Sequence, residues 1–136
     1  MENIMKFYKN DRYSEYVGIE LIEVSKGRAK AKMEIKGHHL NSMGTVHGAA
    51  LFALADLVFA VASNSHGTMA MAINANISYL KAAREGVLRA EGREVSLNPK
   101  LAAYTIHITD ENNDLIAIFQ GMVYRKKETF DLKNGD

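Results

Sequence analysis

The feature that most constrains the fold is an almost wholly apolar segment at residues 49–62, which carries one charged side chain, Asp56. Apolar residues recur along it at helical spacing, and further alanine, leucine and valine residues fill the remaining helical faces. A helix that is apolar on every face must be surrounded by protein, and this one is shorter than the roughly 20 residues that span a bilayer. The segment therefore predicts a central core helix that begins at residues 47–48 and ends at residues 63–67, and no membrane partner.

Strands are expected on both sides of this helix, because apolar and polar residues alternate there as they do on a half-buried sheet. In residues 27–35, for example, Ala29, Ala31 and Met33 alternate with charged side chains. The expected strands are residues 17–25, 27–35, 69–80, 87–96, 101–109 and 115–125. Short polar turns favour antiparallel neighbours. Two strands, one apolar helix and four strands predict an α+β fold in which a curved antiparallel sheet wraps around the helix.

Residues 1–136 are expected to form a single domain, because no linker, low-complexity tract or internal repeat divides them. Residues 1–16 mix charges with aromatic side chains and predict an N-terminal helical segment, with the helix at residues 5–16. Residues 126–136 are charged, lack a core pattern and predict a flexible tail.

Composition argues against several classes of function. The net charge of +1 provides no global field that would draw the chain onto nucleic acid or an anionic membrane. The absence of cysteine excludes disulfides, thiolate zinc sites and a cysteine nucleophile, and it fits a reducing cytoplasm. The N-terminus has no apolar stretch followed by a small-residue cleavage site, as a secretory signal would have. A cytoplasmic protein with a small-molecule ligand is therefore expected.

Asp56 is unusual because a carboxylate within an apolar helix is costly to bury without a partner. Such a residue either bonds to the backbone or to a subunit interface, or it has a raised pKa and a catalytic role. Gly48 begins the same helix, where free N–H groups and the helix dipole can stabilise an oxyanion. The absence of a side chain at Gly48 lets a carbonyl group approach the amide closely.

The spacing of these two residues predicts an assembly. From position 48 to position 56 the helix rises by ~12 Å, so one subunit cannot easily bring both residues to the same reacting carbon. If both act on one carbonyl group, a second copy of the chain must supply one of them. The sequence therefore predicts an obligate homodimer with shared active sites.

Three segments carry a resemblance to a known family, namely residues 41–48 (NSMGTVHG), 51–56 (LFALAD) and 62–67 (ASNSHG). They resemble the PaaI-type branch of the hotdog-fold thioesterases, which includes the phenylacetate-degradation thioesterase, and the likeness extends over residues 17–125. The resemblance implies a hotdog fold and hydrolysis of acyl-CoA thioesters to free acid and CoA. Leucine, phenylalanine and methionine side chains from the helix and the partner sheet would line the acyl pocket, and they suggest an aryl or medium-chain acyl group. The resemblance also implies a homodimer that assembles into a homotetramer, and no cofactor apart from the coenzyme A of the substrate.

The resemblance further implies roles for individual residues. Asp56 would act as general base or nucleophile, the Gly48 N–H would stabilise the oxyanion, and Asn41 would orient the reacting groups. The chain departs from the family pattern at Ala49, where a second glycine is usual. It also departs at Ala72, where some relatives place a serine that assists the water, so that this role is vacant or passes to a neighbouring polar residue, Thr68 or Asn74.

Substrate binding is expected to involve the loop before the helix and basic residues near strand ends, which suit the phosphates of coenzyme A. The expected substrate-binding residues are His47, Asn74, Lys81, Arg84 and Lys100. Residues 125–127 form a further basic group. A charged turn is often merely solvated, so each basic residue alone is a weak signal.

No metal site is expected, because His38, His39 and His47 lack the carboxylate spacing of an H-E-x-x-H motif. His107, within an expected strand, is interpreted as structural. Two other functions stay open: a hotdog hydratase or dehydratase, and a non-catalytic acyl-CoA-binding or regulatory domain. The position of His47 at the helix start disfavours the first, and the presence of Asp56 disfavours the second.

Overall fold

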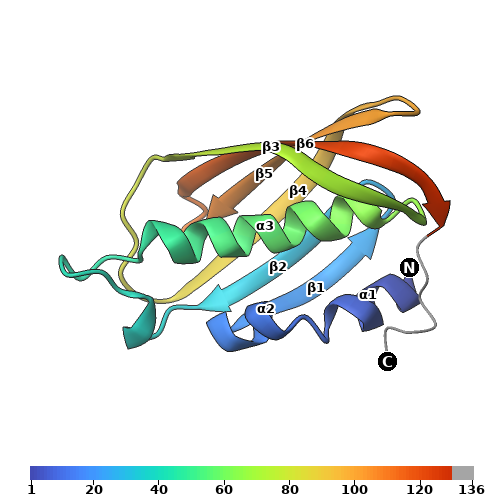
Figure 1. The fold of residues 1–136 in the computed structure, drawn as a ribbon. Coiled ribbons are helices and arrows are strands. Elements are labelled where there is room, and N and C mark those ends of the chain that lie inside the picture. The colour runs from blue at the N-terminus through green and yellow to red at the C-terminus, as the bar shows by residue number, and fades with distance from the viewer. Residues whose placement is uncertain (130–136) are drawn as a thin grey trace.

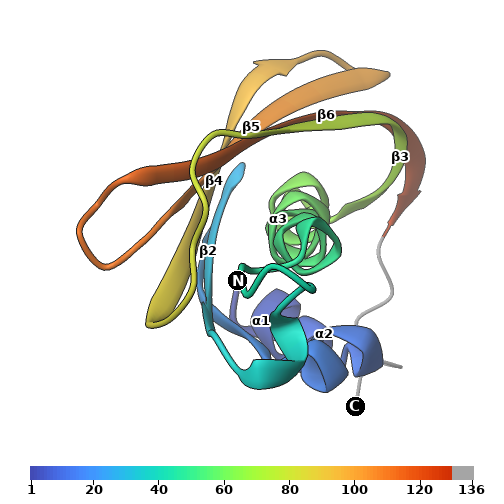
Figure 2. The ribbon, with the colours of Figure 1, turned by 90° about the vertical axis from the view of Figure 1, so that its left-hand side faces the viewer.

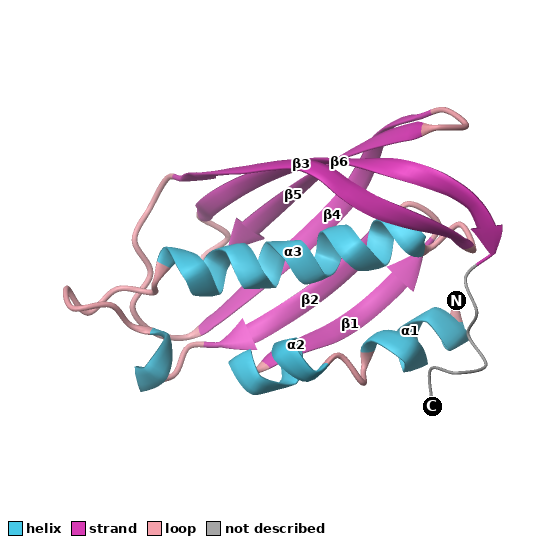
Figure 3. Cartoon of the chain, viewed as in Figure 1, coloured by secondary structure: helices cyan, strands magenta, loops and turns pink. Residues whose placement is uncertain are grey.

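The computed structural model describes residues 1–129 of the chain. Six antiparallel strands form one sheet in the order β1-β2-β4-β5-β6-β3, and this sheet curves around the long helix α3 (Figures 1 and 3). The helices are α1 (Glu2–Tyr8), α2 (Arg12–Val17), the 3-10 helix η1 (Gly37–His39) and α3 (Gly48–Asn64). The strands are β1 (Ile19–Ser25), β2 (Arg28–Glu34), β3 (Thr68–Tyr79), β4 (Val87–Leu97), β5 (Leu101–Thr109) and β6 (Leu115–Thr129). The predicted α+β fold with a central helix is confirmed.

The core lies between α3 and the concave face of the sheet, where Val58 and Val61 of the helix are fully buried. Two strand positions carry glycine because the helix comes too close for a side chain. A Cβ atom at Gly92 would lie 2.5 Å from Val58 Cγ1, and one at Gly121 would lie 2.6 Å from Phe59 Cζ. This close packing holds α3, and any site on it, in a defined position relative to the sheet.

The N-terminal segment forms two helices instead of the single one expected. α1 ends at Tyr8, and Asp11 begins α2 as its N-cap, where its carboxylate accepts a hydrogen bond from the Ser14 N–H at 3.1 Å. Gly18, with φ of 94°, then ends α2 in a left-handed conformation. The strand that was expected from residue 17 consequently starts at Ile19.

The expected flexible tail is wrong for its first four residues. Residues 126–129 continue β6, because β3 begins at Thr68 and supplies a partner as far as Thr129. The rest of the expected tail, residues 130–136, lies outside the described residues.

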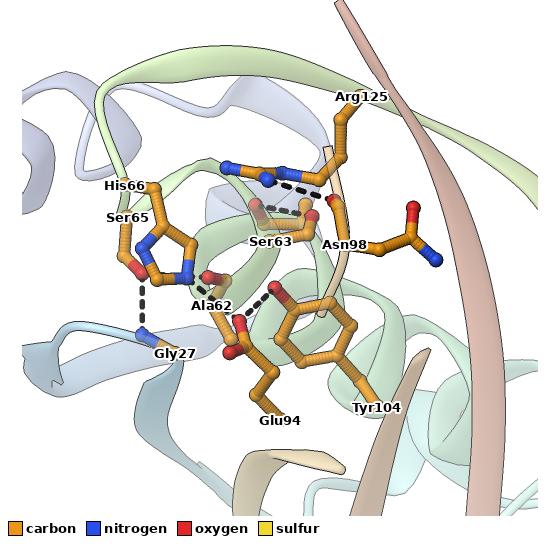
Figure 4. Close-up of polar contacts among 10 residues, drawn as sticks. Gly27, Ala62, Ser63, Ser65, His66, Glu94, Asn98, Tyr104 and Arg125 are labelled. Atoms are coloured by element: carbon orange, nitrogen blue, oxygen red, sulfur yellow. Dashed lines mark hydrogen bonds and ion pairs between the residues drawn. The ribbon is translucent and has the colours of Figure 1, made fainter. Parts of the chain in front are cut away.

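A polar cluster ties the end of α3 to the sheet (Figure 4). The Ser65 hydroxyl accepts a hydrogen bond from the Gly27 N–H at 2.7 Å. The Glu94 carboxylate accepts one from the Tyr104 hydroxyl at 2.7 Å and lies 2.7 Å from His66 Nε2. Burial alone would raise the pKa of Glu94, but the hydrogen bonds from His66 and Tyr104 outweigh it and hold that pKa below its ordinary value. These hydrogen bonds join the residues after α3 to the sheet, so the cluster has a structural role. The sequence pattern did not predict it.

No helix within residues 1–129 is both long enough and apolar enough to span a membrane.

Candidate active site

In the first turn of α3, all but one of the backbone N–H groups of residues 48–51 have a hydrogen-bond acceptor within the described residues. His47 caps the helix, with Nδ1 accepting a hydrogen bond from the Ala49 N–H at 3.0 Å. The N–H groups of Ala50 and Leu51 donate to the His47 carbonyl oxygen at 2.9 and 3.2 Å. Within the described residues, the Gly48 N–H has no hydrogen-bond partner. The amide expected to stabilise an oxyanion is therefore free, at the positive end of the helix dipole.

Gly48 lies in a surface groove of about 420 Å³, between the loop that precedes α3 and the end of β3. This volume is within the range of small-ligand sites. Its walls include Asn41, Val46, Leu51, Tyr79, Leu80 and Lys81. Of the residues expected from the sequence, the structure thus brings Gly48, Asn41 and Lys81 together in one groove, with His47 next to them in the chain.

The Asn41 side chain organises the loop that forms one wall of the groove. Its Oδ1 atom accepts hydrogen bonds from the N–H groups of Met43 and Thr45 at 3.0 and 3.1 Å. Its Nδ2 atom donates to the Thr45 hydroxyl at 3.0 Å. Gly44, with φ of 77°, completes the turn. Asn41 therefore acts on the groove through the loop conformation in this protomer.

Asp56 is the one charged residue of α3. In the view along α3, the sheet wraps around one part of the helix and the α1–α2 segment lies against another (Figure 2). The expectation of a buried carboxylate is wrong for the single protomer, in which Asp56 is exposed. Partial desolvation by the surrounding protein nevertheless raises the pKa of Asp56, and the negative charge of Asp11 adds to the rise.

A single protomer does not bring Asp56 and Gly48 together. Both belong to one uninterrupted helix, Gly48–Asn64, and eight residues of α-helix separate them by ~12 Å. Within the described residues, Asp56 has neither a hydrogen bond nor an ion pair. The Asp56 carboxylate and the Gly48 N–H of one protomer are therefore too far apart to act on the same carbonyl group.

Lys81 and Arg84 follow β3 and differ in their ion pairs. Lys81 pairs with Asp114 at 2.5 Å and with Asp110 at 3.5 Å, and its hydrogen bond to Asp114 raises the Lys81 pKa. Arg84 is exposed and makes no ion pair within residues 1–129. Its guanidinium lies 3.9 Å from the Cβ position of Gly44, so it is close to the loop of the groove.

Two expected substrate-binding residues lie away from the groove. Lys100 is in the turn after β4, and the full length of β4 separates it from Arg84. Asn74 is exposed on β3 and lines a different depression together with Val95 and Gln120. Neither residue lines the groove that contains Gly48.

The histidines of the loop have structural contacts. His39 is buried, accepts a hydrogen bond from the Lys36 N–H at 2.9 Å through Nδ1, and donates from Nε2 to the Val17 carbonyl oxygen at 2.5 Å. In residues 1–129, no three histidine, cysteine, aspartate or glutamate side chains are grouped so that they could hold a metal ion.

Sequence reasoning missed one residue of the groove, Tyr79. Its hydroxyl donates a hydrogen bond to the Gly48 carbonyl oxygen at 3.2 Å. The two residues are 31 positions apart, and Tyr79 looked like an ordinary strand residue. Only the packing of the end of β3 against the start of α3 reveals the contact.

Comparison with known proteins agrees with this geometry. Residues 43–117 match the sequence profile of the thioesterase superfamily. A protein of Archaeoglobus fulgidus whose name assigns it to the esterases is 47% identical over 124 residues, which are 90% of this chain and 80% of that protein. The acyl-coenzyme A thioesterase PaaI of Escherichia coli is 31% identical over 125 residues, covering 91% of this chain and 89% of that protein. The solved structure of the E. coli PaaI protein from the phenylacetic acid degradation operon superposes with a TM-score of 0.89 at 31% identity, over 94% of both chains. The chain therefore belongs to the thioesterase superfamily, as a thioester hydrolase of the PaaI-type hotdog branch.

Proposed function

We propose that this protein hydrolyses acyl-CoA thioesters to a free acid and CoA, at sites that two copies of the chain build together. The observation that carries the proposal is the Gly48 N–H, which has no partner within residues 1–129 and lies inside a ligand-sized groove, at the start of the helix that also bears Asp56. The likeness to an acyl-coenzyme A thioesterase supports the substrate class. Gly48 would bind the thioester oxygen, and Asp56 of the other copy would act as general base or nucleophile.

The edge of the sheet supports the pairing of two copies. β3 is the last strand of the sheet, and within the described residues it pairs only with β6. Met71 and Ile73 on β3 are 52% and 57% exposed, and an apolar, unpaired edge is a template for another chain. Antiparallel pairing of two β3 strands would continue the sheet and set the two α3 helices side by side in opposite directions. If the two-fold axis passes beside Phe52, midway between Gly48 and Asp56, each Asp56 faces the first turn of the other helix.

A second contact would join two such dimers into the expected homotetramer. The outer face of the sheet exposes apolar side chains on β4 and β6, namely Val95, Met122 and Tyr124, which are 50%, 36% and 45% exposed. Exposed apolar side chains gathered on one face commonly mark protein–protein contacts.

Among the basic residues, Arg84 is better placed than Lys81 to bind the phosphates of coenzyme A. A phosphate at Lys81 would have to compete with Asp110 and Asp114, whereas Arg84 is exposed beside the groove and unpaired within residues 1–129. An arginine can also bind a phosphate through two parallel hydrogen bonds. We therefore propose Arg84 as the principal phosphate contact from this end of the protomer. Lys100 and Asn74 would contribute only if another copy presents them.

The groove walls support an apolar acyl group. Val46, Leu51 and Leu80 are aliphatic, and Tyr79 adds an aromatic ring. Asn41, Thr45 and Lys81 form polar parts of the same lining. The apolar part favours an aryl or medium-chain acyl group over acetate, because burial of each further apolar group makes the free energy of binding more favourable.

The proposal is tested by the release of free CoA thiol from benzoyl-, phenylacetyl-, hexanoyl- and acetyl-CoA. We expect the three larger thioesters to be hydrolysed with a kcat/KM at least about tenfold above that of acetyl-CoA, because burial of the longer or aromatic group stabilises the transition state. Binding without thiol release would instead favour the acyl-CoA-binding domain. Loss of the enoyl absorbance of crotonyl-CoA without thiol release would favour the hydratase.

Asp11 should tune the pH at which the site becomes active. Because its negative charge raises the pKa of Asp56, the Asp11→Asn variant should lower that pKa and move the acidic limb of the kcat/KM profile to lower pH. Asparagine can still accept the hydrogen bond from the Ser14 N–H, so α2 keeps its cap. The control is Glu20→Gln, which removes an exposed carboxylate that pairs with Lys32 on the sheet. An unmoved limb, or one moved to higher pH, would contradict the assignment of that limb to Asp56.

A further inference from the structure

Tyr79, the last residue of β3, lies against Gly48 in the groove. Besides the hydrogen bond to the Gly48 carbonyl oxygen, its hydroxyl oxygen would be 2.9 Å from a Cβ atom built on Gly48, and its Cζ atom would be 3.0 Å away. Tyr79 is 54% exposed and lines the groove, so a ligand there can reach the hydroxyl. Any side chain at position 48 would have to displace this tyrosine.

The hydroxyl can leave its present acceptor without leaving a polar group unpaired. The Gly48 carbonyl is in the first turn of α3, where it accepts the intrahelical hydrogen bond from the residue four positions on. It keeps that partner when the Tyr79 O–H turns towards a ligand. The hydroxyl hydrogen turns about the C–O bond, so the change needs no movement of the strand.

The Tyr79 hydroxyl and the Gly48 amide are close enough to share one acceptor. Standard bond lengths place a Cβ atom about 2.5 Å from the amide nitrogen of its own residue, so the hydroxyl oxygen is at most about 5.4 Å from that nitrogen. Two donors can bond one oxygen atom when they are up to roughly 5.8 Å apart, since each bond is about 2.9 Å long. The two groups meet this condition, and oxyanion holes combine donors of this kind.

We propose that the Tyr79 hydroxyl is the second donor of the oxyanion hole and acts with the Gly48 N–H on the thioester oxygen. The inference rests on the proposed thioesterase function. On the general-base route, water forms a bond to the carbonyl carbon, its proton passes to Asp56 of the other copy, and the π electron pair of the C=O bond moves onto oxygen. That oxyanion accepts hydrogen bonds from Gly48 and Tyr79. The C=O bond then re-forms as the C–S bond breaks, and CoA leaves as a thiolate that takes up the proton.

The test is the Tyr79→Phe variant, assayed on the best thioester of the wild type. Removal of one oxyanion donor is expected to lower kcat by about 10²-fold while KM stays within about threefold, because the stronger bond is made only in the transition state. An S-alkyl-CoA thioether, which lacks the carbonyl oxygen, should bind the wild type and the variant equally by calorimetry. The matched control is Tyr16→Phe on α2, since the Tyr16 side chain is 84% exposed and its hydroxyl makes no hydrogen bond within residues 1–129.

Two results would overturn this inference alone. The first is a wild-type kcat in Tyr79→Phe. The second is a loss of thioether affinity equal to the loss of kcat/KM, which would make Tyr79 a wall of the groove and no more. Failure of the unmodified protein to hydrolyse any thioester would refute the proposed function instead. The activity of the unmodified protein is therefore measured before any variant is made.

Discussion

The Asp56→Asn variant is expected to lose about 10³-fold in kcat for acyl-CoA hydrolysis and to remain folded. An amide has nearly the size of the carboxylate, but it can neither take the proton of water nor attack the thioester. Desolvation raises the pKa of Asp56, which makes its carboxylate a stronger base than an ordinary aspartate. The side chain is exposed and has no hydrogen bond or ion pair within the described residues, so its replacement removes no contact of the fold.

The measurement is thiol release at saturating substrate, together with the thermal unfolding midpoint of both proteins. Glu91→Gln serves as control, because Glu91 is an exposed carboxylate on β4 that pairs with Lys30 at 3.7 Å, outside the groove. A variant with unchanged kcat would remove Asp56 from the mechanism. A raised KM with unchanged kcat would make it a binding residue.

Two variants that are inactive alone should restore activity when they share a dimer. The first is Asp56→Asn. The second is Gly48→Pro, which deletes the proposed oxyanion donor itself and should lower kcat by about 10²-fold or more. The backbone accepts proline here, because Gly48 is the first residue of α3 and the preceding His47 has the extended backbone, with φ of −60° and ψ of 138°, that proline favours. The proline ring would also displace the Tyr79 side chain, so the variant removes both proposed donors of its own oxyanion hole.

In a hybrid dimer, one site combines the intact Gly48 of the first chain with the intact Asp56 of the second, and the other site lacks both groups. Co-expressed chains with different affinity tags, purified over both tags, should therefore show about half of the wild-type activity per dimer. If each site lay within one protomer, the hybrid would stay as inactive as its parents. A chain that is a stable monomer at assay concentration would also rule out the shared site.

The main elements of the fold could be predicted because their causes are local. The apolar residues of α3 repeat at helical spacing, and the alternation in β2 follows the two faces of a strand. The errors fall where a neighbour distant in the chain decides. Residues 126–129 have a tail-like composition, yet β6 continues through them to Thr129, which pairs with Thr68 at the start of β3.

The residues of the candidate site also fall into two groups, those that local sequence predicts and those that only tertiary contacts reveal. Gly48, at the start of an apolar helix, and Asp56, within it, were recognisable from the sequence because both depend on position along one helix. The loop contacts of Asn41 also fit a local pattern, since its hydrogen bonds reach no further than Thr45. Such short-range relations are contained in the order of the residues.

Tertiary structure decided the rest. It showed that Asp56 is open to solvent in the protomer, that Lys81 is already paired with Asp114, and that Tyr79 reaches Gly48. The last two contacts join residues 33 and 31 positions apart. They arise from the order of strands in the sheet and from the approach of β3 to α3, and neither is encoded by any window of neighbouring residues. The sequence by itself thus determined which residues could be reactive, whereas the tertiary structure determined which donors and charges surround them, because those neighbours come from other elements.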